Sequence, residues 1–209
     1  MNSSSIQRIL PLMVLFLLTA SCAGTSAPAR DNYYYTLNYP PPAPPFEHTL
    51  PFVLRVDHFI SSPPFNSQSI IFADQGLYRN AYARHHWIAP PAELLAFLLA
   101  RDLKSARVLQ AVLPPDSFAA STHILNGWLE EILEVDLPDG WLASLRLSIT
   151  LIASREADPS RRIIFQKIYA ASAPIGERSP AGMAEAMSTA AAQVSAEVVR
   201  DVYQALMKP

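Results

Sequence analysis

The clearest pattern in the chain is an alternation of apolar and polar residues between Trp141 and Ser154. Odd-numbered positions are apolar there, whereas serine, arginine and threonine occupy most even-numbered positions. Because successive side chains of a strand point to opposite faces, this pattern predicts a strand with one buried and one solvated face, as in antiparallel sheets. Residues 124–136 and 163–171 are similar, and turn-forming residues separate the three segments. The sequence therefore predicts a three-stranded meander.

Shorter β-prone runs occur earlier in the chain. They are residues 33–37, 52–60, 69–72, 77–88 and 108–113. Six prolines lie between positions 40 and 51, where the missing backbone donors favour an extended connection. A stiff surface connection and a site for a proline-reading partner are both open interpretations of that stretch.

Two segments have the pattern of helices. Pro91 suits a first helical turn, and the leucines of residues 92–107 predict a helix that is apolar over most of its circumference and buried against a sheet. Ser179 is the expected N-cap of a helix that runs to the end of the chain, with Pro180 in its first turn. Its apolar stripe is Met183, Met187, Ala190, Ala191, Val194, Val198, Val202 and Leu206. This stripe indicates packing on the meander, or alternatively a helix partner at an oligomer interface.

These elements define the expected fold class. We expect an α/β chain of the α+β class, with a single two-layer domain over residues 33–209. A curved, mainly antiparallel sheet should carry two helices packed on one face. The length is that of one domain with a sizeable core.

The N-terminus has the order of a secretory signal. Arg8 precedes an apolar run over residues 9–18, which is too short to span a membrane and ends in small residues before Cys22. Residues 18–22 resemble a bacterial lipobox, although Thr19 stands where leucine is usual. We expect residues 1–21 to be the signal peptide and residues 22–32 a tether, with diacylglycerol and an N-acyl chain on Cys22. A secreted protein with a free thiol is the alternative.

Composition and the candidate chemical groups exclude several classes of function. The net charge of −2 makes nucleic acid an unexpected partner, and a single cysteine cannot form an internal disulfide. His85 and His86 are adjacent on a predicted strand, so they should point to opposite faces and not share a metal ion. Glu130 and Glu134 should share one strand face, with Glu131 on the other. We expect no enzyme, metal or cofactor; a hydrolase site assembled in space is the distant alternative.

Several stretches together resemble a known family. Residues 77–91 form an aromatic and arginine-bearing strand that ends in a tryptophan and a proline pair before a leucine-rich helix. Tyrosines begin the first strand, Asn126-Gly127 lies in a later one, and a long helix ends the chain. With the lipobox, this order resembles the ABC-type transport auxiliary lipoproteins, the PqiC-like family, over roughly residues 33–206.

The resemblance implies a function and a set of contacts. Such proteins are non-enzymatic lipoproteins on the periplasmic face of the outer membrane, serving systems in which MCE-domain proteins carry lipids between membranes. An MCE-domain protein, the outer membrane and further copies of the chain are the implied partners. The candidate contact residues are Tyr78, Arg79, Tyr82, Arg84 and Trp87, with a core position as the alternative for Trp87. A lipoprotein that serves outer-membrane protein or lipopolysaccharide assembly is the alternative function.

Overall fold

The computed structural model describes residues 31–42, 46, 48–73 and 77–208. The predictions for the signal peptide, for lipidation at Cys22 and for most of the tether fall outside the described residues. Residues Asn32–Pro209 form one compact unit, and the description below concerns that unit.

The predicted meander is present. Strands β7 (His123–Leu137), β8 (Gly140–Ala153) and β9 (Ile163–Pro174) pair antiparallel along most of their length. Five side chains on the predicted apolar face of β8 are buried, and Trp141 and Ala153 at its ends are half-buried. The five are Ala143, Leu145, Leu147, Ile149 and Leu151. A short helix, α3 (Pro159–Arg162), connects β8 to β9. The alternation in the sequence thus marks the buried face correctly.

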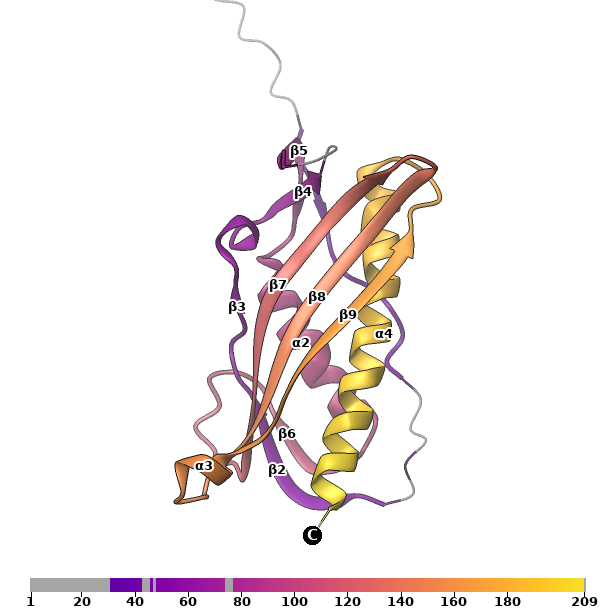
Figure 1. The fold of residues 1–209 in the computed structure, drawn as a ribbon. Coiled ribbons are helices and arrows are strands. Elements are labelled where there is room, and N and C mark those ends of the chain that lie inside the picture. The colour runs from indigo at the N-terminus through magenta and orange to yellow at the C-terminus, as the bar shows by residue number, and fades with distance from the viewer. Residues whose placement is uncertain (1–30, 43–45, 47, 74–76, 209) are drawn as a thin grey trace, which may run out of the picture. The chain divides into compact units, whose positions relative to one another are not determined.

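The other edge of β7 is joined in parallel by three successive strands. These are β2 (Leu50–Val56), β3 (Ile60–Ser61) and β4 (Ser69–Ala73). A 3-10 turn, η2 (Pro63–Phe65), lies between β3 and β4. Each strand pairs with a different part of β7, so β2, β3 and β4 follow one another along the length of β7 (Figure 1).

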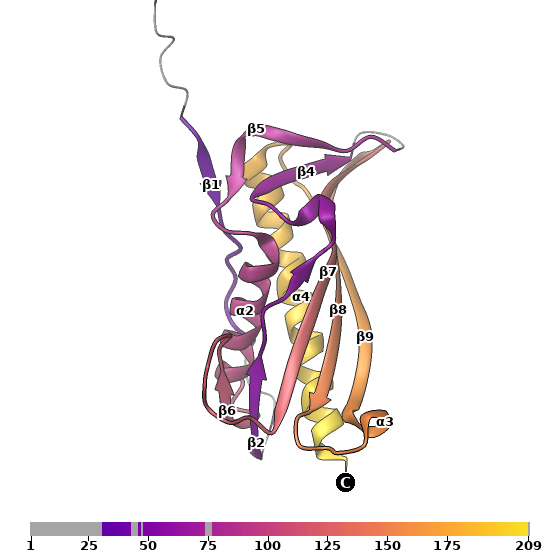
Figure 2. The ribbon, with the colours of Figure 1, turned by 90° about the vertical axis from the view of Figure 1, so that its left-hand side faces the viewer.

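Three more strands complete a nine-stranded mixed sheet. Strand β6 (Leu109–Leu113) pairs in parallel with β2, β5 (Asn80–Trp87) pairs antiparallel with β4, and β1 (Tyr33–Tyr35) pairs in parallel with β5. Figure 2 shows β5 running across one end of the unit, crosswise to the strands of the meander. The curvature was predicted, whereas the parallel pairs, which join segments far apart in the sequence, were not.

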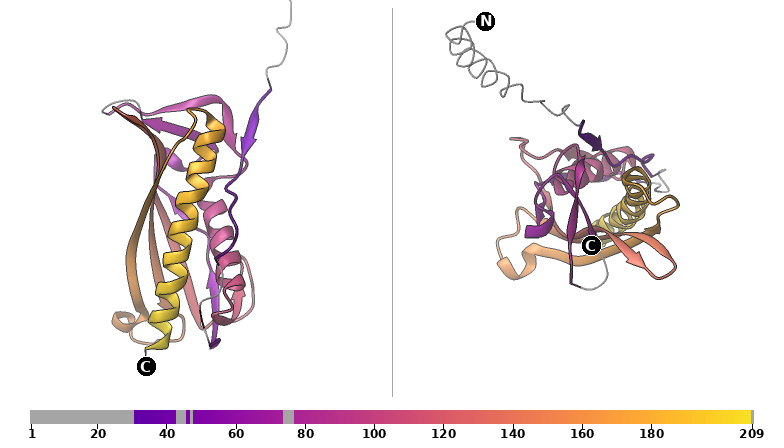
Figure 3. Two further views of the ribbon diagram at one scale, coloured as in Figure 1. Left: turned by 90° about the vertical axis from the view of Figure 1, so that its right-hand side faces the viewer. Right: turned by 90° about the horizontal axis from the view of Figure 1, so that it is seen from above.

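Two helices cover the inner face of this curled sheet. Helix α2 (Pro91–Ser105) packs against β2, β6 and β7, and α4 (Pro180–Met207) packs against β8, β9 and α2. Ser179 caps α4 as predicted, since its hydroxyl accepts a hydrogen bond of 3.0 Å from the backbone N–H of Gly182. Every residue of the predicted apolar stripe is buried. Figure 3 shows both helices on the same side of the meander, which confirms the α+β fold class.

The buried face of α2 covers a smaller part of the helix circumference than predicted. Leu95, Leu99 and Leu103 lie in the core, but Phe97 keeps 70% of its surface exposed. The sheet and α4 meet one side of this helix, so Phe97 faces outward while Leu94 and Leu98 are half-buried at the flanks.

Candidate partner-binding surface

Aromatic rings line the pair of strands where the described domain begins. Because β1 and β5 pair in register, Tyr33 lies beside His85 and Tyr34 beside His86. The ring centres are 5.1 Å apart in the first pair, which is stacked, and 5.8 Å apart in the second. Tyr33 and Tyr34 remain 53% and 54% exposed. The tyrosine-rich start of the domain therefore forms part of an accessible aromatic surface.

The candidate contact residues divide between surface and core. Tyr78 is 76% exposed, and Arg79 and Arg84 are exposed. Arg79 donates a hydrogen bond of 3.1 Å from Nη1 to the Tyr78 carbonyl oxygen. Trp87 is 1% exposed and belongs to the core, the alternative position weighed for it. Tyr78 and Arg79, just before β5, and Arg84 within it are thus the exposed members, and the three are called here the β5 surface.

An irregularity in β5 explains why Tyr82 differs from its neighbours. Ser69 pairs with His86 but Ile71 pairs with Ala81, so β5 uses more residues than β4 over the same distance. The strand bends there, and Tyr82 and His85 meet edge to face at 6.1 Å. The Tyr35 hydroxyl also lies 2.9 Å from His85 Nδ1. In the described part of the chain, no three histidine, cysteine, aspartate or glutamate side chains gather as metal ligands would.

Tyr82 is held by a buried carboxylate. Its hydroxyl donates a hydrogen bond of 2.9 Å to Oε2 of Glu134, which is 1% exposed. Burial raises the pKa of Glu134, and the hydrogen bond from Tyr82 offsets part of that effect. Burial, followed by the bond to Glu134, raises the pKa of Tyr82 to about 12. Tyr82 therefore keeps its proton near neutral pH and serves to fix β5 on β7.

A β-bulge in β7 places Glu134 on the inner face. The β7–β8 register shifts between Leu129 and Glu131. Glu130 accepts a hydrogen bond of 2.7 Å from Arg146, and Glu131 accepts one of 2.6 Å from Ser144. These two β8 residues share the outer face, so Glu130 and Glu131 face outward together. The prediction that Glu130 and Glu134 share a face is therefore wrong, because one extra residue reverses the alternation beyond it.

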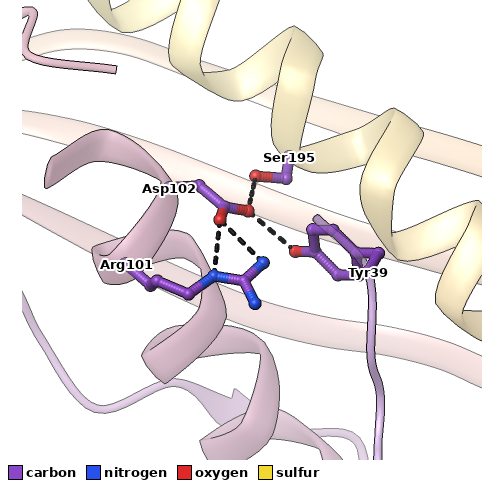
Figure 4. A network of polar contacts seen from close by, with 4 residues as sticks. All are labelled: Tyr39, Arg101, Asp102 and Ser195. Atoms are coloured by element: carbon purple, nitrogen blue, oxygen red, sulfur yellow. Dashed lines mark hydrogen bonds and ion pairs between the residues drawn. The ribbon is translucent and has the colours of Figure 1, made fainter. Parts of the chain in front are cut away.

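A buried polar cluster that no sequence pattern predicted lies between α2 and α4 (Figure 4). Asp102 is fully buried on α2. Its Oδ2 accepts hydrogen bonds from Tyr39 at 2.9 Å and from Ser195 of α4 at 2.5 Å. Its Oδ1 pairs with Arg101, whose guanidinium lies 4.7 Å from the Tyr39 ring centre. A single aspartate within a leucine-rich helix was the available signal.

The chemistry of this cluster is structural. Burial, and then the negative charge of Asp102, raises the pKa of Tyr39, so the phenol stays a hydrogen-bond donor. Ser195 is 2% exposed and directs its hydroxyl toward the carboxylate. Asp102 and Ser195 are buried, and the arrangement of these groups clamps α2, α4 and the segment around Tyr39 together.

A groove of about 550 Å³ lies beside this clamp. Segment 35–40 forms one wall, and small residues of α4, among them Ala184 and Ser188, form the other. The backbone N–H of Asn38 donates a hydrogen bond of 3.0 Å to Ser188 Oγ, which holds the walls together.

Within the described residues, no helix has the length and apolar content needed to cross a membrane.

Comparisons with known proteins identify the fold. No protein-family model matches the chain, and none of the curated proteins matches it. Among solved structures, it resembles protein XCC0632 from Xanthomonas campestris, which is described with the family DUF330. The two sequences are 17% identical, the match covers 82% of this chain and 95% of that chain, and the TM-score is 0.74. An uncharacterized protein matches at 13% identity, with coverages of 83% and 99% and a TM-score of 0.65. The hypothetical protein CT253 from Chlamydia trachomatis matches at 12% identity, with coverages of 75% and 98% and a TM-score of 0.50. At these identities the likeness establishes a shared fold.

Proposed function

We propose that this chain is a lipid-anchored, non-enzymatic accessory component of an MCE-type system that moves lipid between membranes. In this proposal, acyl chains on Cys22 hold it at the periplasmic face of the outer membrane. The domain then docks the end of an MCE-domain protein and fixes where lipid is delivered or collected. The lipobox-like segment and the family resemblance of residues 77–91 support the proposal from the sequence.

One structural observation carries the proposal: the chain enters the domain at β1, which pairs with residues 85–87 of β5, directly after the exposed Arg84. Only residues 23–32 separate Cys22 from Tyr33. Because ten residues reach at most about 35 Å, an anchored domain would keep its β1 and β5 end close to the bilayer. A partner that spans the periplasm and ends at the membrane would meet the domain there.

The composition of the β5 surface suits a protein contact. Tyrosine and arginine are enriched where proteins bind one another, since both combine large contact areas with directed hydrogen bonds. Arg84 lies on β5, which Tyr82 and Trp87 fix to the core, and Tyr78 lies just before that strand. We therefore propose Tyr78, Arg79 and Arg84 as the contact residues, with Tyr82 and Trp87 supporting them from beneath.

Two experiments test the anchor and the contact separately. Radiolabelled palmitate should appear on the wild-type protein in the outer-membrane fraction and be lost in Cys22→Ala. Capture of the co-expressed MCE-domain protein should fall in Arg79→Ala/Arg84→Ala but not in Arg200→Ala. Arg200 is an exposed arginine in the C-terminal part of α4, which lies at the opposite end of the domain from β5 (Figure 1).

The outcomes separate the candidate functions. Absence of label in the wild type would overturn the anchor. Label without capture of any MCE-domain protein would instead favour a lipoprotein that serves envelope assembly. Capture that is equal in all variants would remove the β5 surface from the proposal while leaving the transport role in place.

A further inference from the structure

The outward face of α2 carries an exposed aromatic side chain between two hollows. Phe97 is 70% exposed. On one side of it lies a hollow of about 320 Å³ with Ala100 and Lys104 in its wall. On the other side lies one of about 270 Å³, bounded by Leu94 and Leu98. Figure 2 shows α2 on the side of the domain away from the meander. Val112 and Pro114 line the first hollow together with α2, and Thr36 and Leu37 line the second.

Four residues form a line along this face. Glu93, Phe97, Ala100 and Lys104 are spaced by four, three and four positions, so they recur on one side of the helix. Glu93 and Lys104 are exposed and Ala100 is half-buried. At 1.5 Å per residue the line is about 16 Å long. These four residues are called the α2 outer face below.

The α2 outer face is complementary to itself. The midpoint between Glu93 and Lys104 is also the midpoint between Phe97 and Ala100. When a second α2 lies antiparallel with a two-fold axis at that midpoint, each Phe97 faces Ala100 of the other copy and the hollow beside it. Each Glu93 then faces Lys104 of the other copy. A parallel arrangement would instead place Glu93 against Glu93 and Lys104 against Lys104.

We propose that the α2 outer face binds a second copy of this chain in an antiparallel, two-fold symmetric contact. Phe97 fills the hollow beside Ala100 of the second copy, and two Glu93–Lys104 ion pairs flank the apolar centre. Both sides of such an interface are the same patch, as closed symmetry requires. The contact is independent of the MCE partner, because it uses α2 and leaves the β5 surface free.

The size of the contact sets the expected affinity. One face of a fifteen-residue helix buries less than the roughly 800 Å² per partner of a standard stable interface. We therefore expect dissociation constants in the micromolar range for the isolated protein.

A charge exchange tests the proposal, with the full chain purified in detergent micelles and its mass followed by sedimentation equilibrium from about 1 to about 100 μM. We expect the wild type to form dimers and Phe97→Ala to remain monomeric. Glu93→Lys alone and Lys104→Glu alone should each weaken the dimer by about tenfold, since each turns two attractions into two repulsions. The double variant Glu93→Lys/Lys104→Glu restores both ion pairs and should return to within about threefold of the wild type.

Controls make each outcome decisive. Circular dichroism spectra must show that every variant is folded, and Arg200→Glu, a charge reversal away from α2, should dimerise as the wild type does. A wild type that stays monomeric over the whole range would overturn the proposal. Folded single variants that dimerise normally, or a double variant that fails to recover, would also overturn it. Loss of a different protein partner in the single variants without a change in mass would assign the α2 outer face to that partner instead.

Discussion

Replacement of Asp102 by alanine should be among the most destabilising single changes in the domain. The carboxylate is fully buried and accepts hydrogen bonds from Tyr39 and Ser195 while it pairs with Arg101. Without it, two buried hydroxyls lose their acceptor, and each unsatisfied group costs about 1–3 kcal/mol. The Arg101 side chain is 32% exposed and can turn toward water, so its share is smaller. The sum is about 4 kcal/mol, within the range measured when one partner of a buried ion pair is removed.

Urea unfolding followed by circular dichroism measures this loss, and thermal unfolding should show a melting temperature lower by about 8–16 °C. Ser195→Ala and Tyr39→Phe alone should each cost about 1.5 kcal/mol, because each removes one hydrogen bond to a charged acceptor. In the Asp102→Ala background the same two changes should restore about 1–2 kcal/mol, since they remove the hydroxyls that lack an acceptor. Asp139→Ala, at an exposed turn position, is the control and should stay within about 0.5 kcal/mol of the wild type.

The stability of the triple variant relative to Asp102→Ala shows whether the two hydroxyls depend on the Asp102 carboxylate. If Tyr39→Phe/Asp102→Ala/Ser195→Ala is less stable than Asp102→Ala by the sum of the two single losses, the hydroxyls act independently of Asp102 and the clamp is refuted. An Asp102→Ala loss below about 1 kcal/mol would refute it as well, because it would mean that water or another acceptor satisfies the Tyr39 and Ser195 hydroxyls.

Three further changes test the packing and electrostatics of the sheet and α4. Gly127→Ala should destabilise the domain by about 1–3 kcal/mol in urea unfolding, because an added Cβ would lie 2.5 Å from the Phe59 ring, and Phe59→Leu should relieve part of the loss. Glu134→Gln should gain stability relative to the wild type as pH rises, because the pKa of Glu134 is raised in the folded state. As pH rises above about 4.3, the carboxyl ionises first in the unfolded chain. The wild type therefore loses stability until the pH passes the folded-state pKa. Unfolding curves for both proteins at pH 4 and pH 8 measure this, and an equal difference at the two pH values would contradict it. Ser179→Ala should cost about 1 kcal/mol by loss of the α4 N-cap, with Ser179→Asp close to the wild type in the same assay.

The sequence predicts those parts of the fold that have local causes. The meander follows from a two-residue period between turn residues, and the start of α4 follows from Ser179 and Pro180. By contrast, the parallel pairing of β2 with β7 joins Leu54 to His123, and no local pattern marks such a contact. The bulge between Leu129 and Glu131 is a similar case, since its effect on Glu134 arises from a register shift that depends on the partner strand.

The candidate site divides in the same way. An aromatic and arginine-rich strand indicates a surface for a partner, and Tyr78 and Arg84 are indeed exposed. The alternation of β5 alone would place Tyr82 and Arg84 together, but the bend of the strand directs Tyr82 toward Glu134. Asp102 could have been recognised as unusual in a leucine-rich helix, yet its partners lie on segments 63 and 93 residues away. Their meeting depends on tertiary packing that no single segment specifies.

The buried clamp and the α2 outer face occupy opposite sides of one helix, which gives the Asp102 experiment a second use. Asp102 and Lys104 lie two positions apart, so the clamp on the inner side fixes the rotation at which α2 presents its outer face. If the helix pairs with a second copy, Ser195→Ala should leave the outer residues intact but loosen α2 against α4. The dimer should then weaken by a small factor, whereas Phe97→Ala abolishes it without affecting unfolding by more than about 1 kcal/mol, because Phe97 is largely exposed. The two variants therefore separate loss of the contact from loss of the support that positions it.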